Sequence, residues 1–155
     1  QINRIGQIDG NFVFAAIDGR TNLAIYGTNG SEQEPRLLAS FPRDSVNQAF
    51  FLKGSQSSLS DRADIALPGN KLIFTVDTRR SGQSFKELWV TDGTELGTQQ
   101  LREFALPQNA SYNLLRDFYP IGDAVMFVAV TPLAGEELWR TDGTIAGTQQ
   151  ISEFN

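Results

Sequence analysis

Short hydrophobic runs separated by turn residues follow one another along this chain. Three of them, residues 12–16, 72–76 and 124–130, are rich in Val, Ile, Phe and Ala. Runs of this length and composition, bounded by Gly, Asn and Asp, predict β-strands. The preceding turns are Asp9-Gly10-Asn11, Gly69-Asn70-Lys71 and Gly122-Asp123. Residues 45–52 and 112–118 come nearest to a helical period but are short, so the pattern predicts an all-β chain.

Two of these runs lack a strict alternation of apolar and polar residues. Residues 73–76 and 125–128 offer apolar side chains to both faces of a strand. Such strands suit a sheet that is covered on both faces, and a blade of a β-propeller has this environment because it lies between two other blades. We therefore expect three blade-like antiparallel sheets that stack on one another.

An octapeptide recurs 50 residues further along the chain, at 87–94 and at 137–144. It reads ELWVTDGT in the first copy and ELWRTDGT in the second, and Gly-Thr-Gln-Gln follows each, at 97–100 and 147–150. A more divergent third copy occupies residues 23–31, where we expect Tyr26 to be displaced from the Trp position. Self-similarity at such a spacing is typical of repeat architectures. The sequence thus predicts a single repeat domain, residues 1–155, with units at about 5–41, 65–104 and 118–154.

The segments between these units have a different composition. Residues 42–63 and 105–113 are predicted to be connections, and the Ser-rich residues 55–64 to be an exposed inserted loop. The hydrophobic groups Phe50-Phe51-Leu52 and Leu114-Leu115 are either adhesive patches or connecting strands. Asn29-Gly30-Ser31 and Asn109-Ala110-Ser111 match the short glycosylation pattern, which plain turns also match.

The Asp-Gly-Thr part of the octapeptide predicts a tight turn. Glycine tolerates a positive φ, the Asp carboxylate accepts bonds from nearby backbone N–H groups, and the Thr hydroxyl can add another bond. A calcium site would need a denser oxygen cluster than one carboxylate followed by Gly-Thr, so we expect no metal. The predicted structural turn residues are Asp92, Gly93, Thr94, Asp142, Gly143, Thr144, Asn29 and Gly30.

Composition excludes several classes of function. The 155 residues are 40% apolar, which suits a globular domain. With 13 basic and 18 acidic residues the net charge is −5, so nucleic acid is not an expected partner. Cys and His are absent, which removes thiolate and imidazole chemistry, and no apolar run approaches the length of a transmembrane helix. No cofactor is expected, and because the chain begins at Gln1 we expect it to be processed or part of something longer.

Three sets of side chains could carry a function. Trp89 and Trp139 could stack on sugars, although a repeated Trp in a strand is more often inter-sheet packing. Carboxylates could act in pairs in glycoside hydrolysis, but equivalent positions in every unit indicate a structural role. Arg79-Arg80 is interpreted as a solvated loop pair. The candidate carboxylates are Glu87, Glu103, Glu136 and Glu137, and the candidate arginines of a convergent cluster are Arg79, Arg80, Arg116 and Arg140.

The pattern at 87–98 and 137–148 resembles the bacterial ELWxxDGT repeat family. This resemblance implies a β-propeller-type repeat in an extracellular or cell-envelope protein, with the divergent first unit as a capping repeat. Since closed propellers have about four to eight blades, three units imply a larger or oligomer-completed ring, with an open array of stacked units as the alternative. We expect a structural, protein-interaction module that binds a protein partner or copies of itself and is not an enzyme. The alternative is a glycan-binding module with one site per repeat.

Overall fold

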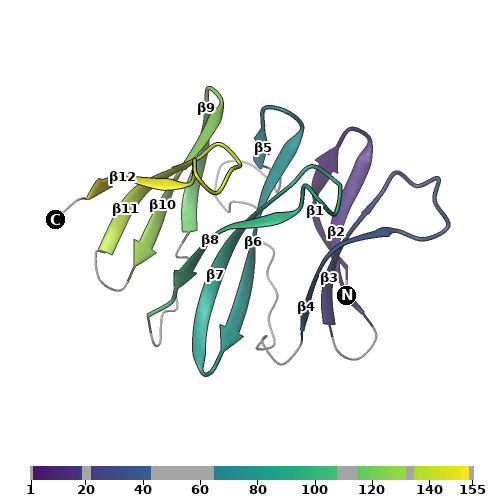
Figure 1. Cartoon of the computed structure of the whole chain (residues 1–155), viewed down its shortest axis with the longest axis horizontal. Coiled ribbons are helices and arrows are strands. Elements are labelled where there is room, and N and C mark those ends of the chain that lie inside the picture. The colour runs from purple at the N-terminus through teal and green to yellow at the C-terminus, as the bar shows by residue number, and fades with distance from the viewer. Residues whose placement is uncertain (1, 19–21, 43–64, 108–114, 132–134, 154–155) are drawn as a thin grey trace.

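A computed structural model describes residues 2–18, 22–42, 65–107, 115–131 and 135–153. Over these residues the chain is all-β, as predicted, and contains three four-stranded antiparallel sheets and no helix (Figure 1). Within the ranges described, no helix is therefore long and apolar enough to cross a membrane.

Each sheet is a meander in which strands that follow one another in sequence are hydrogen-bonded neighbours. The N-terminal sheet contains β1 (Ile2–Ile8), β2 (Asn11–Asp18), β3 (Asn22–Thr28) and β4 (Arg36–Pro42). The central sheet contains β5 (Ile65–Leu67), β6 (Lys71–Arg80), β7 (Gln83–Thr91) and β8 (Gln99–Ala105). The C-terminal sheet contains β9 (Leu115–Ile121), β10 (Ala124–Thr131), β11 (Gly135–Thr141) and β12 (Gln149–Glu153).

The three predicted turns join the first two strands of each sheet. Asp9 and Gly10 have φ values of 46° and 76°, and Gly69 and Asn70 have values of 80° and 55°. Asn and Asp tolerate this left-handed region better than other residues with side chains, which is why they occur with Gly here. Nδ2 of Asn70 donates to Oδ2 of Asp9 at 2.7 Å, so the first turns of two sheets are also bonded to each other.

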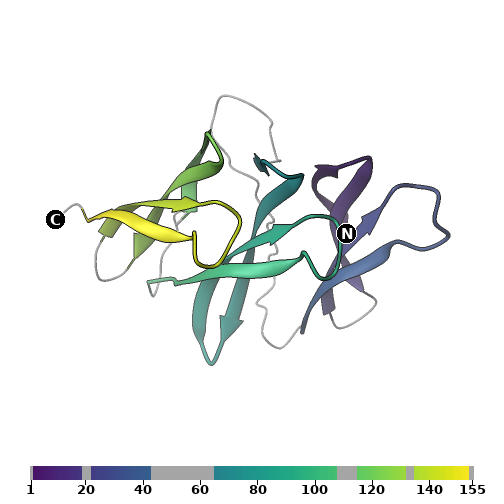
Figure 2. The same ribbon diagram turned by 45° about the horizontal axis from the view of Figure 1, so that its top comes forward.

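The central sheet lies between the other two, and both views show this order (Figures 1 and 2). One hydrophobic core lies between the N-terminal and central sheets and includes Leu72, Phe74 and Val76. A second core lies between the central and C-terminal sheets and includes Ile73. The apolar character of both faces of residues 73–76 is therefore explained by burial on both sides, as predicted.

The same aromatic contact occurs at both joints between sheets. Phe41 of β4 meets the ring of Trp89 edge-on at a centroid distance of 5.1 Å, and Phe104 of β8 meets Trp139 in the same way at 5.0 Å. We call the face of each sheet that carries Trp89, Trp139 or the matching Tyr26 the Trp face. Each joint packs the Trp face of one sheet on the opposite face of the preceding sheet.

The last strand of each sheet contains a register shift at the same place. Opposite the pairs Ile25/Tyr26, Leu88/Trp89 and Leu138/Trp139, the partner strand has one extra residue. A β-bulge of this kind re-aims a side chain. The extra residues are Leu38, Leu101 and Ile151, and we call the sheet face opposite the Trp face the bulge face.

The hydrophobic runs did not predict the first strand of any sheet, although Leu115, interpreted as part of a connecting strand or an adhesive patch, begins β9 and is buried. Both β1 and β9 contain register shifts, which interrupt the alternation of apolar residues, and β5 has only three residues. Pro120 lies in β9, an edge strand, where a missing N–H is tolerated. Residues 115–118, part of the segment with the nearest helical period, belong to this strand. The other such segment, residues 45–52, lies outside the described residues, as do the predicted loop 55–64, Phe50-Phe51-Leu52 and Leu114.

Candidate functional site

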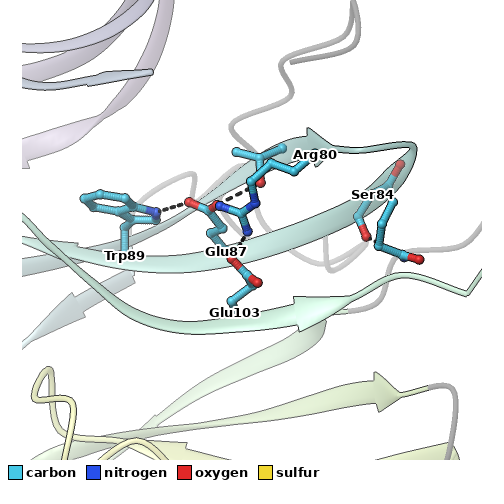
Figure 3. Close-up of polar contacts among 7 residues, drawn as sticks. Arg80, Ser84, Glu87, Trp89 and Glu103 are labelled. Atoms are coloured by element: carbon cyan, nitrogen blue, oxygen red, sulfur yellow. Dashed lines mark hydrogen bonds and ion pairs between the residues drawn. The ribbon is translucent and has the colours of Figure 1, made fainter. Parts of the chain in front are cut away.

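Glu87 and Trp89 lie two residues apart on β7 and therefore project from the same face of the central sheet. Nε1 of Trp89 donates to Oε2 of Glu87 at 2.9 Å (Figure 3). Oγ1 of Thr78 donates to Oε1 of Glu87 at 2.7 Å. Glu87 is only 3% exposed. A buried carboxylate requires donors for its oxygens, and here each oxygen has at least one.

Arg80 extends this network to β8. Its Nη1 lies 3.3 Å from Oε1 of Glu87, and its Nη2 binds Oε2 of Glu103 (Figure 3). The guanidinium carbon also lies 4.5 Å from the centroid of the Phe85 ring. Interpreting Arg79-Arg80 as a loop pair is therefore wrong, because both residues lie in β6. Both are exposed, as expected, and Arg80 additionally binds two carboxylates.

The C-terminal sheet repeats the Glu-Trp pair. Nε1 of Trp139 donates to Oε2 of Glu137 at 3.3 Å, and Oγ1 of Thr131 donates to Oε1 at 3.4 Å. Glu137 is again 3% exposed. The two buried glutamates thus hold the indole of their own unit, which is a structural use of a carboxylate.

The candidate arginines and carboxylates are divided between two sheets. Glu103 joins Glu87 only through Arg80 in the central sheet. In the C-terminal sheet Arg116 pairs with Glu136, Nη2 to Oε1, at 2.7 Å, and also binds Asp117. Arg140 belongs to that sheet as well. The structure therefore does not bring the four arginines into one cluster.

The Asp-Gly-Thr turn has identical bonding in the central and C-terminal sheets. Oδ1 of Asp92 accepts from the backbone N–H of Thr94 at 2.9 Å and from its Oγ1 at 2.7 Å. The corresponding distances from Asp142 to Thr144 are 2.9 and 2.6 Å. Gly93 and Gly143 have φ values of 85° and 81°, a conformation that glycine adopts without strain.

The second Gly-Thr of the repeat completes this turn. A Cβ at Gly97 would lie 2.0 Å from the carboxylate of Asp92, so any other residue at this position would displace that side chain. Backbone N–H of Gly97 donates to Oγ1 of Thr94 at 3.0 Å, and Oγ1 of Thr98 donates to the Thr94 carbonyl at 2.6 Å. Residues 142–148 make the same bonds, and a Cβ at Gly147 would lie 2.1 Å from Asp142.

The N-terminal sheet forms the same turn with different residues. Oδ1 of Asn29 accepts from the backbone N–H of Ser31 at 2.9 Å and from its Oγ at 2.7 Å. Backbone N–H of Gly30 donates to Oγ1 of Thr28 at 3.0 Å. Asn and Ser thus replace Asp and Thr with the bonds intact, and the Asn29-Gly30-Ser31 glycosylation match is a turn.

Hydrogen bonding lowers the pKa of both turn aspartates. The hydroxyl of Thr94 is the main cause at Asp92, and the Thr94 backbone N–H and the positive charge of Lys71 act in the same direction. At Asp142 the hydroxyl of Thr144 is again the main cause, with Arg140 as the nearby positive charge. Partial burial opposes the shift at both carboxyls.

Neither predicted ligand-binding Trp presents a free ring. Trp139 is 5% exposed and lies between Phe127, stacked at 6.3 Å, and Phe104. The guanidinium of Arg102 lies 5.1 Å from its centroid. Trp89 is half-buried in the other core, stacked on Phe74 at 6.2 Å. Both rings occupy joints between sheets, whereas sugar stacking requires an exposed ring face.

Tyr26 occupies the Trp position of the first unit, so the expectation that it is displaced was wrong. It pairs across strands with Phe14, as Trp89 pairs with Phe74 and Trp139 with Phe127. Tyr26 also stacks on Phe14, with centroids 5.6 Å apart. The residue at the glutamate position of this unit is Ala24, so the glutamate carboxylate is absent there.

No group of three or more Asp or Glu side chains that could hold a metal ion occurs among the residues with described positions. The second glycosylation match, Asn109-Ala110-Ser111, lies outside those residues. Comparisons with protein-family models, curated proteins and solved structures give no match to this chain.

Proposed function

We propose that this chain is a β-propeller-type structural module that binds a protein partner, or copies of itself, through its sheet faces and loops. The observation that carries the proposal is the repeated joint between sheets. Phe41 packs edge-on against Trp89 at the first joint, and Phe104 packs against Trp139 in the same way at the second. A unit that adds to its neighbour by a fixed contact is the basis of propellers and other repeat scaffolds.

The use of the repeat residues supports a scaffold. Glu87 and Glu137 hold indoles, Asp92 and Asp142 close turns, and both Trp rings fill joints. These side chains are already bonded within the fold. The resemblance to the ELWxxDGT repeats supports placing the module in a bacterial surface or envelope assembly.

Site-specific photo-crosslinking in the native cells tests this function. A benzophenone amino acid in place of Tyr119, which is 68% exposed, should give light-dependent adducts with protein on the uncovered face of the C-terminal sheet. The same group in place of exposed Gln99 serves as the comparison. Adducts that contain only carbohydrate, or no adducts, would contradict the proposal.

Tryptophan fluorescence separates this function from the glycan-binding alternative. Because both rings are packed between sheets, oligosaccharide titration should leave the emission unchanged. A saturable change in emission that is lost in Trp89→Phe or Trp139→Phe would favour carbohydrate binding instead.

A further inference from the structure

The exposed hydrophobic side chains are concentrated on the two faces that no described sheet covers. Eight large hydrophobic side chains are exposed among the residues that the structure describes. Three lie on the Trp face of the N-terminal sheet and three on the bulge face of the C-terminal sheet. Leu96 and Ile145 follow the Asp-Gly-Thr turns instead. The first three are Ile2, Phe12 and Leu37, and the second three are Tyr119, Ile121 and Ile151.

Equivalent positions show what normally covers the bulge face. Ile8, Leu67 and Ile121 each pair with the first residue of the second strand of their sheet. Ile8 and Leu67 are 4% exposed because the next sheet packs on them, whereas Ile121 is 56% exposed. The bulge residues behave alike, since Leu38 and Leu101 are 4% exposed and Ile151 is 43% exposed.

The Trp face shows the complementary pattern. Phe12, Leu72 and Val125 each pair with the threonine that precedes the turn, Thr28, Thr91 or Thr141. Leu72 and Val125 are 2% and 0% exposed beneath the preceding sheet, but Phe12 is 38% exposed. The first and last sheets therefore expose the two complementary halves of one joint.

We propose that the Trp face of the N-terminal sheet of one copy packs on the bulge face of the C-terminal sheet of a second copy, repeating the internal joint between chains. This inference rests on the proposed function and specifies its partner. A head-to-tail contact of this kind is heterologous, so it either closes into a ring, which has six sheets when two copies form it, or continues into a filament.

Charge at the rim of the two faces is also complementary. Arg140 stands at the position of Val90, whose Cγ2 lies 3.5 Å from a Cβ built on the turn glycine Gly143 of the next sheet. The turn that would meet Arg140 is Asn29-Gly30-Ser31, and two glutamates follow it. Glu32 is already paired with Arg36, Oε1 to Nε, at 3.2 Å, so Glu34 is the acidic residue that would face Arg140. An ion pair at this rim would orient the second copy, and added salt should then slow its association.

Complementation between two variants tests the proposal in solution. The Trp-face variant carries Phe12→Glu and Leu37→Glu, and the bulge-face variant carries Ile121→Glu and Ile151→Glu. By light scattering, the unaltered chain should exceed 17.1 kDa and each variant alone should remain at that mass, with association weakened at least about 100-fold. An equimolar mixture should form a heterodimer of about twice 17.1 kDa, because each variant keeps one intact half of the joint.

Controls keep each outcome interpretable. All four substituted side chains are 38 to 56% exposed, so circular dichroism should show an unchanged fold. Leu96→Glu alters a side chain that is 98% exposed but lies on neither face, and it should leave association intact. A monomeric unaltered chain, self-association of either variant alone, or loss of association in Leu96→Glu would each overturn the inference. If any of these results were obtained, photo-crosslinks from position 119 to a different protein would still support the proposed function.

Discussion

At the residue scale, the repeat signature is explained by one small turn. Asp92 receives two bonds from Thr94, and Thr94 in turn receives the backbone N–H of Gly97. The sequence identified the Asp-Gly-Thr part because its turn chemistry is local. It did not assign a role to Gly97, since the contact between this residue and the Asp92 carboxylate depends on how the loop folds back.

A double-mutant cycle measures this contact. Gly97→Ala should destabilise the protein by about 1 to 3 kcal/mol, because its Cβ would overlap the Asp92 carboxylate. Asp92→Ala should cost about 1 kcal/mol through lost hydrogen bonds. The double variant should cost less than the total of the two, since it removes the overlap. Urea unfolding of the unaltered protein, the two single variants and the double variant gives the coupling free energy. Strictly additive losses of stability would contradict the predicted overlap.

The turn aspartates also predict a dependence of stability on pH. Their folded pKa lies below the ordinary value of 3.8, so the unfolded chain binds more protons in acid. Their contribution is present above pH 3.8 and is lost as the pH falls through the lower, folded pKa. The double variant Asp92→Asn and Asp142→Asn should stay folded near pH 7, as Asn29 makes the same bonds, and should lose less stability below pH 4. Acid titration followed by circular dichroism compares the two proteins. If the unaltered protein and the double variant lost stability equally between pH 4 and lower pH, the prediction would be contradicted.

At the element scale, sequence and structure agree where the strands are regular. The second strands were predicted from apolar runs, and the third from the octapeptide, because their register is unbroken over β6 and β7 and over β10 and β11. The first strands were not predicted, because bulges in β1 and β9 change which residues share a face and β5 has only three residues. The sequence placed the Trp residues in the packing between sheets, but it could not identify Phe41 and Phe104 as their partners, since these lie 48 and 35 positions away.

Tryptophan emission gives a separate readout for each joint. Phe104→Ala removes the edge contact on Trp139 and should cost about 3 to 5 kcal/mol, shifting the emission of that indole to longer wavelength. Phe41→Ala should act on Trp89 in the same way. Each variant is measured in the Trp89→Phe and Trp139→Phe backgrounds. A Phe104→Ala shift that depends on Trp89 would contradict the assignment of the joints.

At the scale of the whole molecule, the stacking order of the sheets determines which sheet is most resistant to local unfolding. The central sheet is covered on both faces, and each outer sheet on one. The sequence predicted stacked sheets, but apolar residues at 125–128 also predicted a second covered face for the C-terminal sheet. In the structure Val125 and Phe127 face the central sheet, while Met126 and Val128 lie half-buried on the uncovered bulge face.

Hydrogen exchange should reveal this difference in dilute solution. Amides of β6 and β7 should exchange more slowly than those of β2, β3, β10 and β11, because opening the central sheet disrupts two cores. Mass spectrometry of peptic fragments provides the comparison. Equal protection in all three sheets would indicate that the outer faces are already covered.

Because of the bulge, the number of residues between the turn glycine and the last strand is constrained independently of which residues they are. From the turn glycine to the bulge residue there are eight steps in every unit, Gly30 to Leu38, Gly93 to Leu101 and Gly143 to Ile151, although the first loop shares almost no letters with the others. Removing one residue there would send every later side chain, including the phenylalanine of the joint, to the wrong side of the sheet. The number of residues in this loop is therefore the same in all three units, although their identities differ between the first unit and the other two.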